Sequence, residues 1–371
     1  MRAARIYLAA GGTGGHVFPA LAVAEVLKER GFDPHLLTDR RGATLLAGID
    51  QLPVTVTELH AASPFQRGSL RRIIALGILA AGAMSAFFKF LLNRPKIVIG
   101  FGGYPSFAPL LVSRVLGVPT MMHEQNAFLG RANRVMTAGA RLLALSWPNT
   151  KNLPEDIQTR VTGMPVRTAF FAKRNQRRIG EEMVLTILGG SQGATILGTL
   201  VPDALAMIDA PLIKKIRVYQ QARPEQIATL RERYHALGII ANISDFYTDM
   251  PDLLGKSDLV LCRAGASSIA ELAAIGRASL MLPLPSAMDD HQRANALQME
   301  QVGGGHCLDE NTLSPAFLAT RIIQLFEAPE KLRLMAANAT KLASPDAAKD
   351  IAELAINLTQ NRNLRSFGAA A

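Results

Sequence analysis

The chain has 371 residues, a length typical of two domains, and 49% of them are hydrophobic while 19% are charged. This composition supports sizeable cores and excludes disorder as the main state. A formal net charge of +10 favours anionic partners, such as nucleotide phosphates, nucleic acid or acidic lipid. Cys262 and Cys307 lack metal-ligand spacing and indicate reduced thiols in a cytosolic setting, and residues 1–7 show no secretory signal.

Short apolar runs alternate with amphipathic stretches along the chain. The first run, residues 6–10, predicts a buried strand, followed by a Gly-rich turn and a helix over 19–30, with Pro19 in its first turn and Gly31 as its stop. Further strands are predicted at 96–99, 120–123, 142–146, 184–188, 216–220, 259–262 and 279–282. Strands that alternate with helices indicate parallel sheets, so the predicted fold class is α/β.

The pattern of strand, Gly-rich turn and helix begins twice. The first turn is 11–15 (GGTGG) and the second is 189–193 (GGSQG). Two such beginnings predict two doubly wound domains, with a ligand in the cleft between them. The boundary is expected within 163–180, a stretch that contains Met164-Pro165 and a basic run typical of a linker.

Gly-rich segments follow two predicted strands of the first domain. The turn 11–15 can present backbone N–H groups, and the next helix its positive end, to a phosphate or a developing charge. A tight turn without a ligand is the alternative, and the dinucleotide pattern G-x-G-x-x-G is absent. The cluster 100–104 (GFGGY) is expected at the same carboxyl edge of the sheet, where open α/β sheets bind ligands.

Polar residues follow these strands. His16 comes directly after the first Gly turn, where the positive helix end would lower its pKa and suit it to general-base work. Residues 123–126 (HEQN) form a dense set of donors and acceptors, which favours a sugar-binding or base role over a solvated loop. The aspartate Asp39 lies after a further segment but not in a clear ribose-binding context.

Two polar segments of the second half carry alternatives. Ser268 and Glu271 match a capping box, so Glu271 is either structural or a carboxylate that binds both hydroxyls of a ribose. If residues 289–295 are helical, His291 and Asn295 share one face. The adjacent carboxylates at 289 and 290 are weak evidence for a metal site.

Residues 73–92 (IIALGILAAGAMSAFFKFLL) are long and apolar enough to span a bilayer. A spanning helix would place Lys89 in or near the hydrocarbon and would split an α/β domain across the membrane. Basic residues flank the segment at positions 67, 71, 72, 94 and 96. We therefore predict an interfacial helix or helix pair on anionic headgroups, with a buried core helix as the alternative.

Five motifs in chain order together resemble the MurG family of peptidoglycan N-acetylglucosaminyltransferases, namely 11–22, 100–104, 123–126, 189–194 and 265–271. The resemblance covers nearly the whole chain and implies two Rossmann-like doubly wound domains facing a cleft, the B-type glycosyltransferase fold. Residues 1–165 would form an acceptor- and membrane-facing domain, 166–350 the UDP-GlcNAc-binding domain, and a helix at about 351–365 would pack back on the first domain. Met164 and Ala264 depart from the family's usual Asn and Ser.

The resemblance implies an inverting hexosyltransferase of peptidoglycan and cell wall synthesis, and hence of cell shape and division. It would move GlcNAc from UDP-GlcNAc to the C4 hydroxyl of MurNAc in lipid I, forming the β-1,4 link of lipid II. No cofactor, metal or nucleic acid is implied. The expected partners are the two substrates, an anionic membrane surface and proteins of cell-wall synthesis, at the cytoplasmic face of the bacterial inner membrane. The alternatives are a UDP-GlcNAc 2-epimerase, a glycosyltransferase acting on another lipid and a basic nucleotide- or nucleic-acid-binding module.

A single displacement needs one base, room for an oxocarbenium-like transition state and stabilisation of the departing diphosphate. We predict His16 as the base, with Glu124 as a rival or an orienting partner. By resemblance, Tyr247 takes the uracil position, Glu271 the ribose position, and Gln292 the GlcNAc hydroxyls. The full set of expected substrate-binding residues is Thr13, Gly14, Gly15, Tyr104, Asn126, Arg167, Ser191, Tyr247, Ala266, Ser267, Ser268, Glu271, His291, Gln292 and Asn295.

Overall fold

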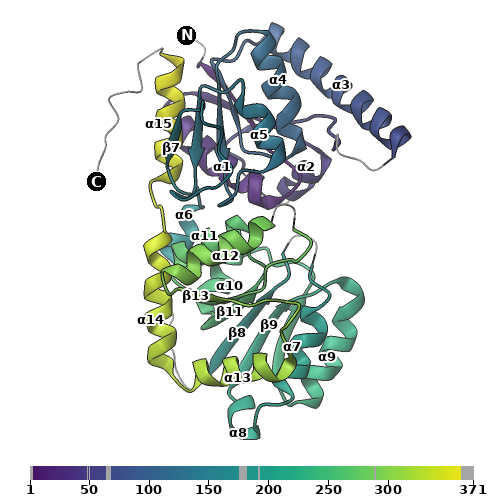
Figure 1. Cartoon of the computed structure of the whole chain (residues 1–371), viewed down its shortest axis with the longest axis vertical. Helices are drawn as coiled ribbons and strands as arrows, with labels where there is room; N and C mark the ends of the chain where they lie inside the picture. The colour runs from purple at the N-terminus through teal and green to yellow at the C-terminus, as the bar shows by residue number, and fades with distance from the viewer. Residues whose placement is uncertain are drawn as a thin grey trace. The chain divides into compact units, whose positions relative to one another are not determined.

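The computed structural model describes residues 3–47, 49, 51–63, 68–174, 182–190, 193–287 and 290–360. The chain forms two compact units (Figure 1). Unit 1 comprises Met1–Arg167 and Ser344–Ala371, and unit 2 comprises Thr168–Ala343. The change of unit therefore comes two residues after the expected position 165, and the chain returns to unit 1 at Ser344, seven residues before the expected 351.

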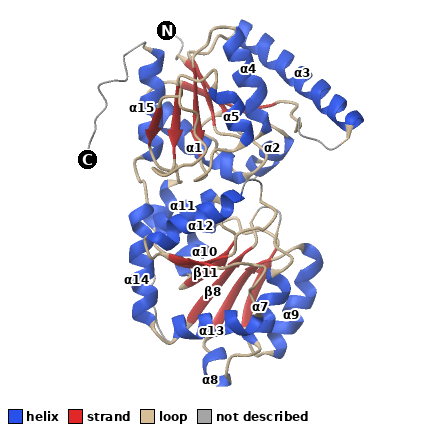
Figure 2. Ribbon diagram, in the orientation of Figure 1, coloured by secondary structure: helices blue, strands red, loops and turns tan. Residues whose placement is uncertain are grey.

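Unit 1 contains a parallel sheet in the order β3-β2-β1-β4-β5-β6-β7. The strands are β1 (Arg5–Ala9), β2 (Asp33–Thr38), β3 (Thr55–Glu58), β4 (Ile97–Gly100), β5 (Thr120–Glu124), β6 (Leu142–Leu145) and β7 (Thr159–Val161). Its helices are α1 (Gly14–Glu29), α2 (Arg40–Leu46), α3 (Ser69–Leu92), α4 (Phe107–Val115), α5 (Arg131–Thr137) and α15 (Ala347–Thr359), with a short 3₁₀ turn η1 (Tyr104–Ser106). Figure 2 shows the strands in red between helices in blue.

Two hydrophobic layers cover the two faces of this sheet. Ile6 and Leu8 of β1 pack in the cluster that contains α1 and the α15 residues Ile351 and Leu358. Tyr7, on the opposite face of β1, packs with Phe90 of α3. The central strands are therefore buried on both sides, which explains why they are continuous apolar runs in the sequence.

The helix after the first Gly turn begins earlier than predicted. It starts at Gly14, so Pro19 lies inside the helix, and the prediction that Pro19 occupies the first turn is wrong. The stop is confirmed: Gly31 has φ 81°, and its N–H donates to the Lys28 carbonyl at 3.0 Å. Glycine adopts this left-handed conformation without steric cost. Because the helix starts within the Gly-rich turn, the turn and the first helical N–H groups form one local structure.

Unit 2 repeats this architecture with a parallel sheet in the order β10-β9-β8-β11-β12-β13. The strands are β8 (Met183–Leu188), β9 (Ile216–Gln221), β10 (Ile240–Ser244), β11 (Leu259–Cys262), β12 (Ala278–Met281) and β13 (Gly305–Cys307). The helices are α6 (Thr168–Ala172), α7 (Leu197–Leu205), α8 (Ala210–Ile213), α9 (Ile227–Ala236), α10 (Met250–Lys256), α11 (Ala266–Ile275), α12 (His291–Gln301), α13 (Pro315–Phe326) and α14 (Pro329–Ala339), with 3₁₀ turns η2 (Pro224–Gln226) and η4 (Thr340–Leu342). Two doubly wound α/β units are thus confirmed, as are all eight predicted strands.

The apolar segment 73–92 lies in α3, one continuous helix of 24 residues that crosses beside α4 (Figure 1). Within the described part of the chain it is the one helix that is long and apolar enough to cross a membrane. Of its most apolar 18-residue stretch, 28% is buried. Phe90 is buried, whereas Ile73 and Phe88 are 66% and 57% exposed. Lys89 turns toward the protein and donates to Thr57 Oγ1 of β3 at 3.1 Å. The core-helix and helix-pair alternatives are therefore wrong, and a single helix with a wide exposed apolar face remains.

Candidate active site

The two Gly-rich segments of unit 1 meet at the carboxyl ends of β1 and β4, as predicted. A Cβ atom on Gly103 would lie 2.5 Å from the Gly11 carbonyl oxygen, and one on Gly102 would lie 3.0 Å from the His16 ring. Gly102 and Gly103 also have positive φ angles of 92° and 75°. Only glycine permits both the backbone conformation and the close approach. The second cluster therefore forms a wall against the first turn and the imidazole.

The His16 ring is oriented by the turn that precedes it. Nδ1 lies 3.1 Å from the Gly11 carbonyl oxygen and 3.2 Å from Thr13 Oγ1. Because a carbonyl oxygen can only accept, the contact with Gly11 favours the tautomer in which Nδ1 carries the proton. Nε2 then holds the lone pair, and a Cβ atom on Gly102 would lie 3.2 Å from it. This tautomer leaves Nε2 as the nitrogen that can accept a proton.

Glu124, at the end of β5, is buried among N–H donors. Its Oε1 accepts from the backbone and side-chain amides of Asn126 at 2.9 and 3.1 Å. Its Oε2 accepts from Asn133 Nδ2 at 2.7 Å and from the Gly130 backbone at 3.3 Å. Burial raises the pKa of Glu124. The amide donors favour the ionised carboxylate and oppose this shift, but burial has the larger effect. This geometry fits a carboxylate that shapes the loop after β5.

His123, next to Glu124, is also buried but plays a different part. Its Nε2 lies 3.1 Å from the Gly163 carbonyl and 3.3 Å from Ser146 Oγ. Burial lowers the pKa of His123 to about 4. Nδ1 is buried and has no hydrogen-bond partner among the described residues, so protonation there would bury an unpaired N–H. His123 therefore binds Gly163, in the segment before the unit boundary, as a neutral imidazole.

The remaining predicted residues of unit 1 surround this edge. Thr13 precedes α1, and Gly14 and Gly15 form its first turn. Tyr104 begins η1 after the Gly wall. Arg167, the last residue before unit 2, places its guanidinium 4.8 Å from the centre of the Phe18 ring on α1.

In unit 2, the start of α11 lies at the carboxyl end of β11. Gly265 precedes the helix, and Ala266, Ser267 and Ser268 form its first turn. The capping-box prediction is wrong, because Ser268 lies inside the helix and cannot be its N-cap. Glu271 follows on the next turn, so the structural reading of Glu271 as a capping partner is lost.

The second polar segment is helical from His291, where α12 begins, so the condition under which His291 and Asn295 share one face is met. Gln292 Oε1 accepts from the Leu284 backbone at 3.0 Å, and Asn295 Nδ2 donates to the Ala264 carbonyl at 3.2 Å. Asn295 is completely buried, so its side chain fastens the loop before α11. α12 thereby joins the loops that follow β11 and β12 into one surface at the carboxyl edge.

Tyr247 follows β10, but its hydroxyl points back into unit 2. It donates to the Asn242 carbonyl at 2.8 Å, and burial raises the pKa of Tyr247 to about 12. Any contact of Tyr247 with a nucleobase therefore comes from its ring or its backbone. Ser191 lies outside the described residues; Gly190 and Gly193 on either side have φ angles of 76° and 67°.

The two departures from the family pattern have local partners. Met164 is buried, and its sulfur accepts a 3.5 Å contact from Ser146 Oγ. Ala264 is fully buried below the start of α11 and offers its carbonyl to Asn295. Both sites therefore remain packed and hydrogen-bonded without the amide or hydroxyl that the family usually carries there.

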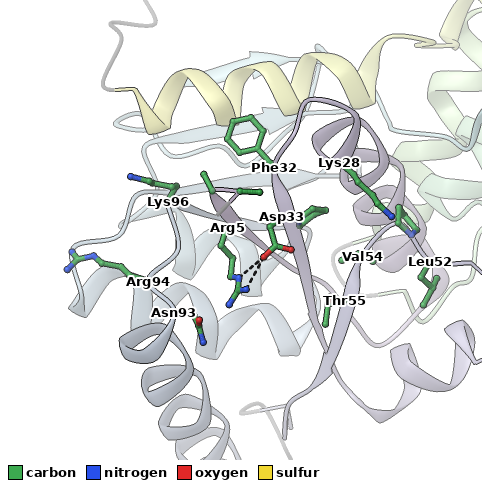
Figure 3. Close-up of a pocket in the computed structure, with 14 residues that line it drawn as sticks. Arg5, Lys28, Phe32, Asp33, Leu52, Val54, Thr55, Asn93, Arg94 and Lys96 are labelled. Carbon is green, nitrogen blue, oxygen red and sulfur yellow. Dashed lines mark hydrogen bonds and ion pairs between the residues drawn. The ribbon is translucent and has the colours of Figure 1, made fainter. Parts of the chain in front are cut away.

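A pocket of about 660 Å³ in unit 1 lies elsewhere, at the amino ends of β1 and β2 (Figure 3). Arg5 donates to Asp33 across it at 2.9 Å, whereas Arg94 and Lys96 extend away from this pair. The positive charges do not converge on one point, so this pocket does not resemble a phosphate cradle. In the described residues, no group of three or more His, Cys, Asp or Glu side chains could hold a metal ion.

Sequence reasoning missed two residues of the candidate site. Asn133 donates to Glu124 from α5. Asp39, which was considered only as a ribose ligand, accepts from the backbone of Gly12 at 3.0 Å. Asp39 also caps α2 through Gly42, and this local pattern after β2 was the signal available in the sequence. Its link to the first Gly turn depends on strand β2, which was not predicted.

Known proteins resemble the chain over almost its whole length. Residues 6–142 match the glycosyltransferase family 28 N-terminal domain, and 184–351 match the C-terminal domain of that family. The UDP-N-acetylglucosamine–N-acetylmuramyl-(pentapeptide) pyrophosphoryl-undecaprenol N-acetylglucosamine transferase of Paramagnetospirillum magneticum is 40% identical over 365 residues, 96% of this chain and 98% of the relative. The protein of the same name from Rhodospirillum rubrum is 42% identical, covering 94% and 90%.

Solved structures agree on the fold. Acinetobacter baumannii MurG matches with a TM-score of 0.75 and 28% identity, over 95% of this chain and 99% of that one. A UDP-GlcNAc 2-epimerase from Neisseria meningitidis matches with a TM-score of 0.68 over 95% of this chain and 100% of that one, but only 15% identity, and shares the fold alone. The predicted B-type glycosyltransferase fold is confirmed.

Proposed function

The chain belongs to glycosyltransferase family 28, and from this premise we infer that it is a MurG-type N-acetylglucosaminyltransferase. It transfers GlcNAc from UDP-GlcNAc to lipid I and forms lipid II in peptidoglycan synthesis. The observation that carries this conclusion is the identity of about 40% over nearly the full length of relatives with that activity. The epimerase alternative rests on a shared fold only.

His16 is the general base of the proposed reaction. Nε2 takes the proton from the C4 hydroxyl of MurNAc as that oxygen attacks the anomeric carbon of GlcNAc. The bond between this carbon and the diphosphate oxygen breaks, and UDP leaves with the electron pair. One displacement turns the α-linked donor into a β-1,4-linked product, so no covalent enzyme intermediate is required. The Nδ1–Gly11 contact supports this role because it leaves Nε2 unprotonated.

Unit 2 binds UDP-GlcNAc and unit 1 binds lipid I in this proposal. The N–H groups at the start of α11 stabilise negative charge on the diphosphate, since a helix N-terminus has unpaired donors and a positive dipole end. Tyr247 lies against the uracil, Glu271 binds the ribose hydroxyls, and Gln292 with His291 contacts GlcNAc. Glycine backbone at the first turn, Tyr104, Asn126 and Arg167 border the acceptor and the sugar. Asn295 acts indirectly by holding the loop of Ala264.

The product identifies the activity. Incubation of the wild-type protein with UDP-GlcNAc and a soluble lipid I analogue should yield a disaccharide whose NMR spectrum shows GlcNAc on C4 of MurNAc in the β configuration. Recovery of an epimerised UDP-sugar instead of a disaccharide would contradict the proposal and favour the epimerase.

We also propose that α3 anchors the enzyme peripherally to the cytoplasmic face of the inner membrane, where lipid I resides. Most of its large apolar residues are exposed, and Arg71, Arg72, Arg94 and Lys96 lie at its two ends. This arrangement fits an interfacial helix whose apolar face enters the lipid while the flanking cations meet anionic headgroups.

Replacing Ile73, Leu76 and Phe88 together by serine should reduce cosedimentation with phosphatidylglycerol vesicles at least about tenfold. These side chains are 66%, 54% and 57% exposed, and each would remove apolar area from water on insertion. Turnover of a soluble lipid I analogue should stay unchanged, because none of the three touches the candidate site.

The vesicle-binding experiment needs a matched control variant. Serine at Met207, Phe317 and Leu334, apolar positions of unit 2 that are 57%, 45% and 62% exposed, should leave vesicle binding intact. Phe90→Ser is not a suitable test, because Phe90 is buried and packs 4.9 Å from the Tyr7 ring. Equal losses of vesicle binding in the two triple variants would count against a membrane role of α3.

A further inference from the structure

One peptide group of the first Gly turn is hydrogen-bonded at both ends. The carbonyl of Gly11 lies 3.1 Å from His16 Nδ1, and the N–H of Gly12, in the same peptide group, donates to Asp39 Oδ1 at 3.0 Å. A continuous path therefore runs from the imidazole through a single peptide group to a carboxylate. Hydrogen bonds in such chains polarise one another, so charge at one end strengthens the bond at the other.

The surroundings hold this peptide group in one orientation. A Cβ on Gly11 would lie 2.8 Å from Asp39 Oδ1 and 2.5 Å from Pro105 Cγ. Gly12 has φ 81°, which disfavours any other residue. On the other side, Gly103 packs against the Gly11 carbonyl. The peptide plane cannot turn without losing these contacts, so the path is a fixed feature of the turn.

Asp39 is itself well anchored. It follows β2 directly, and the Oδ1 atom that accepts from Gly12 also accepts from the Gly42 backbone at 3.0 Å, which caps α2. The strand and the cap place the carboxylate behind the turn. Because Gly12 N–H is occupied by this carboxylate, it is not available to bind a substrate phosphate, contrary to the expectation that the turn presents its backbone donors to a ligand.

Other titratable or charged groups lie on the elements around His16. His123, from β5, is close enough for electrostatic coupling and is neutral, because burial lowers its pKa to about 4. Glu124 is screened by its amide donors, one of which, Asn133, also lies against Gly102. Arg167 lies over the ring of Phe18, two residues after His16 on α1. Asp39 is the carboxylate whose hydrogen bond reaches the peptide group that holds the imidazole.

We propose that Asp39 is the carboxylate partner of His16 and acts on it through the Gly11–Gly12 peptide group. This inference rests on the proposed role of His16 as the base. Asp39 is a positioning residue: it fixes the Nδ1-protonated tautomer and stabilises the imidazolium that forms when Nε2 takes the acceptor's proton. Its role corresponds to that of the carboxylate in a Ser-His-Asp triad, except that a peptide group lies between carboxylate and imidazole.

Three substitutions of Asp39 separate charge, hydrogen bonding and the helix cap. Asp39→Asn keeps an oxygen that can accept from Gly12 and Gly42 but removes the charge. Asp39→Ser can still cap α2, but its hydroxyl is shorter and loses the bond to Gly12. Asp39→Ala loses both. Ser314→Ala, which removes the cap of α13 in unit 2, is the control for loss of a helix cap alone.

The readouts are the pH dependence of kcat/KM and the ¹⁵N NMR titration of His16. Wild-type His16 should be protonated on Nδ1 and not on Nε2 in its neutral form. Asp39→Asn should lower the pKa of His16 and move the acidic limb of the profile down by about half to one pH unit, less than a charge in direct contact produces. Asp39→Ser should lower kcat by about tenfold or more with little change in the KM for UDP-GlcNAc, and Ser314→Ala should change stability only.

A neutral His16 protonated on Nε2, or a His16 pKa that is the same in wild type and Asp39→Asn, would overturn the proposal. The NMR titration needs no turnover, so it separates the two levels of inference. If His16→Ala retains normal transfer, the proposed role of His16 as base fails. If it does not, but Asp39→Asn leaves the titration of His16 unchanged, only the role of Asp39 fails.

Discussion

His16→Ala should lower kcat by about 10²–10⁴-fold while the affinity for UDP-GlcNAc changes little, the range that loss of a positioned general base usually produces. The ring lies between the Gly11 carbonyl and the Gly102–Gly103 wall, and its Nε2 is the nitrogen without a proton. The alanine variant keeps the turn and the helix but leaves the acceptor hydroxyl without a base. Steady-state transfer and donor binding, measured on one preparation, check the result.

Glu124→Gln is the comparison for this experiment. Glutamine keeps the shape of the side chain but presents an N–H₂ group to Asn133 or to the Asn126 backbone, both of which are donors. We expect a loss of stability and a slower but measurable reaction whose pH profile still follows His16. If His16→Ala kept near-normal turnover while Glu124→Gln abolished it, the assignment of the base would reverse.

The stability of unit 1 should fall steeply between pH 6.5 and pH 4. Burial lowers the pKa of His123 to about 4, against 6.5 for an exposed histidine. Across this window the unfolded chain binds a proton that the folded chain does not, so the free energy of unfolding falls as the pH drops. The full effect is roughly 3 kcal/mol. Urea unfolding at several pH values, followed by the fluorescence of Trp147, measures it; this single tryptophan is buried in unit 1.

His123→Gln isolates the contribution of the histidine. The glutamine amide can still donate to the Gly163 carbonyl but does not titrate, so the fall of stability in this window should become shallower. Glu124 acts with the opposite sign, because its pKa is raised and the folded state binds its proton more readily. The difference between wild type and variant removes that contribution. Parallel curves for the two proteins would show that His123 does not control the acid sensitivity.

The strands that are buried on both faces were predicted best from the sequence. Central strands such as β4 and β11 are continuous apolar runs, and each was predicted within one residue of its bounds. β2, β3, β7, β10 and β13 were missed because they are edge or near-edge strands with mixed polar and apolar residues. Edge strands bury less surface, so their residues carry a weaker pattern.

Local motifs predicted the site only in part. The Gly clusters and His16 were found because chain neighbours determine their geometry. The capping box at Ser268 failed because α11 already begins at Ala266, with Gly265 as its N-cap, so the loop after β11 sets the helix start. The Asp39–Gly12 bond joins residues 27 positions apart and depends on the pairing of β1 with β2. Within α3, spacing alone did not distinguish buried Phe90 from exposed Phe88.

One transfer assay tests the central claim most directly. It combines labelled UDP-GlcNAc with a lipid I analogue in detergent and EDTA, and compares wild type, His16→Ala and Glu124→Gln with donor binding measured in parallel. The account predicts a β-1,4-linked disaccharide lipid from the wild type without added metal, and its near-complete loss in His16→Ala with donor binding retained. Donor binding without any transfer by the wild type would contradict the account and assign the chain another acceptor or another reaction.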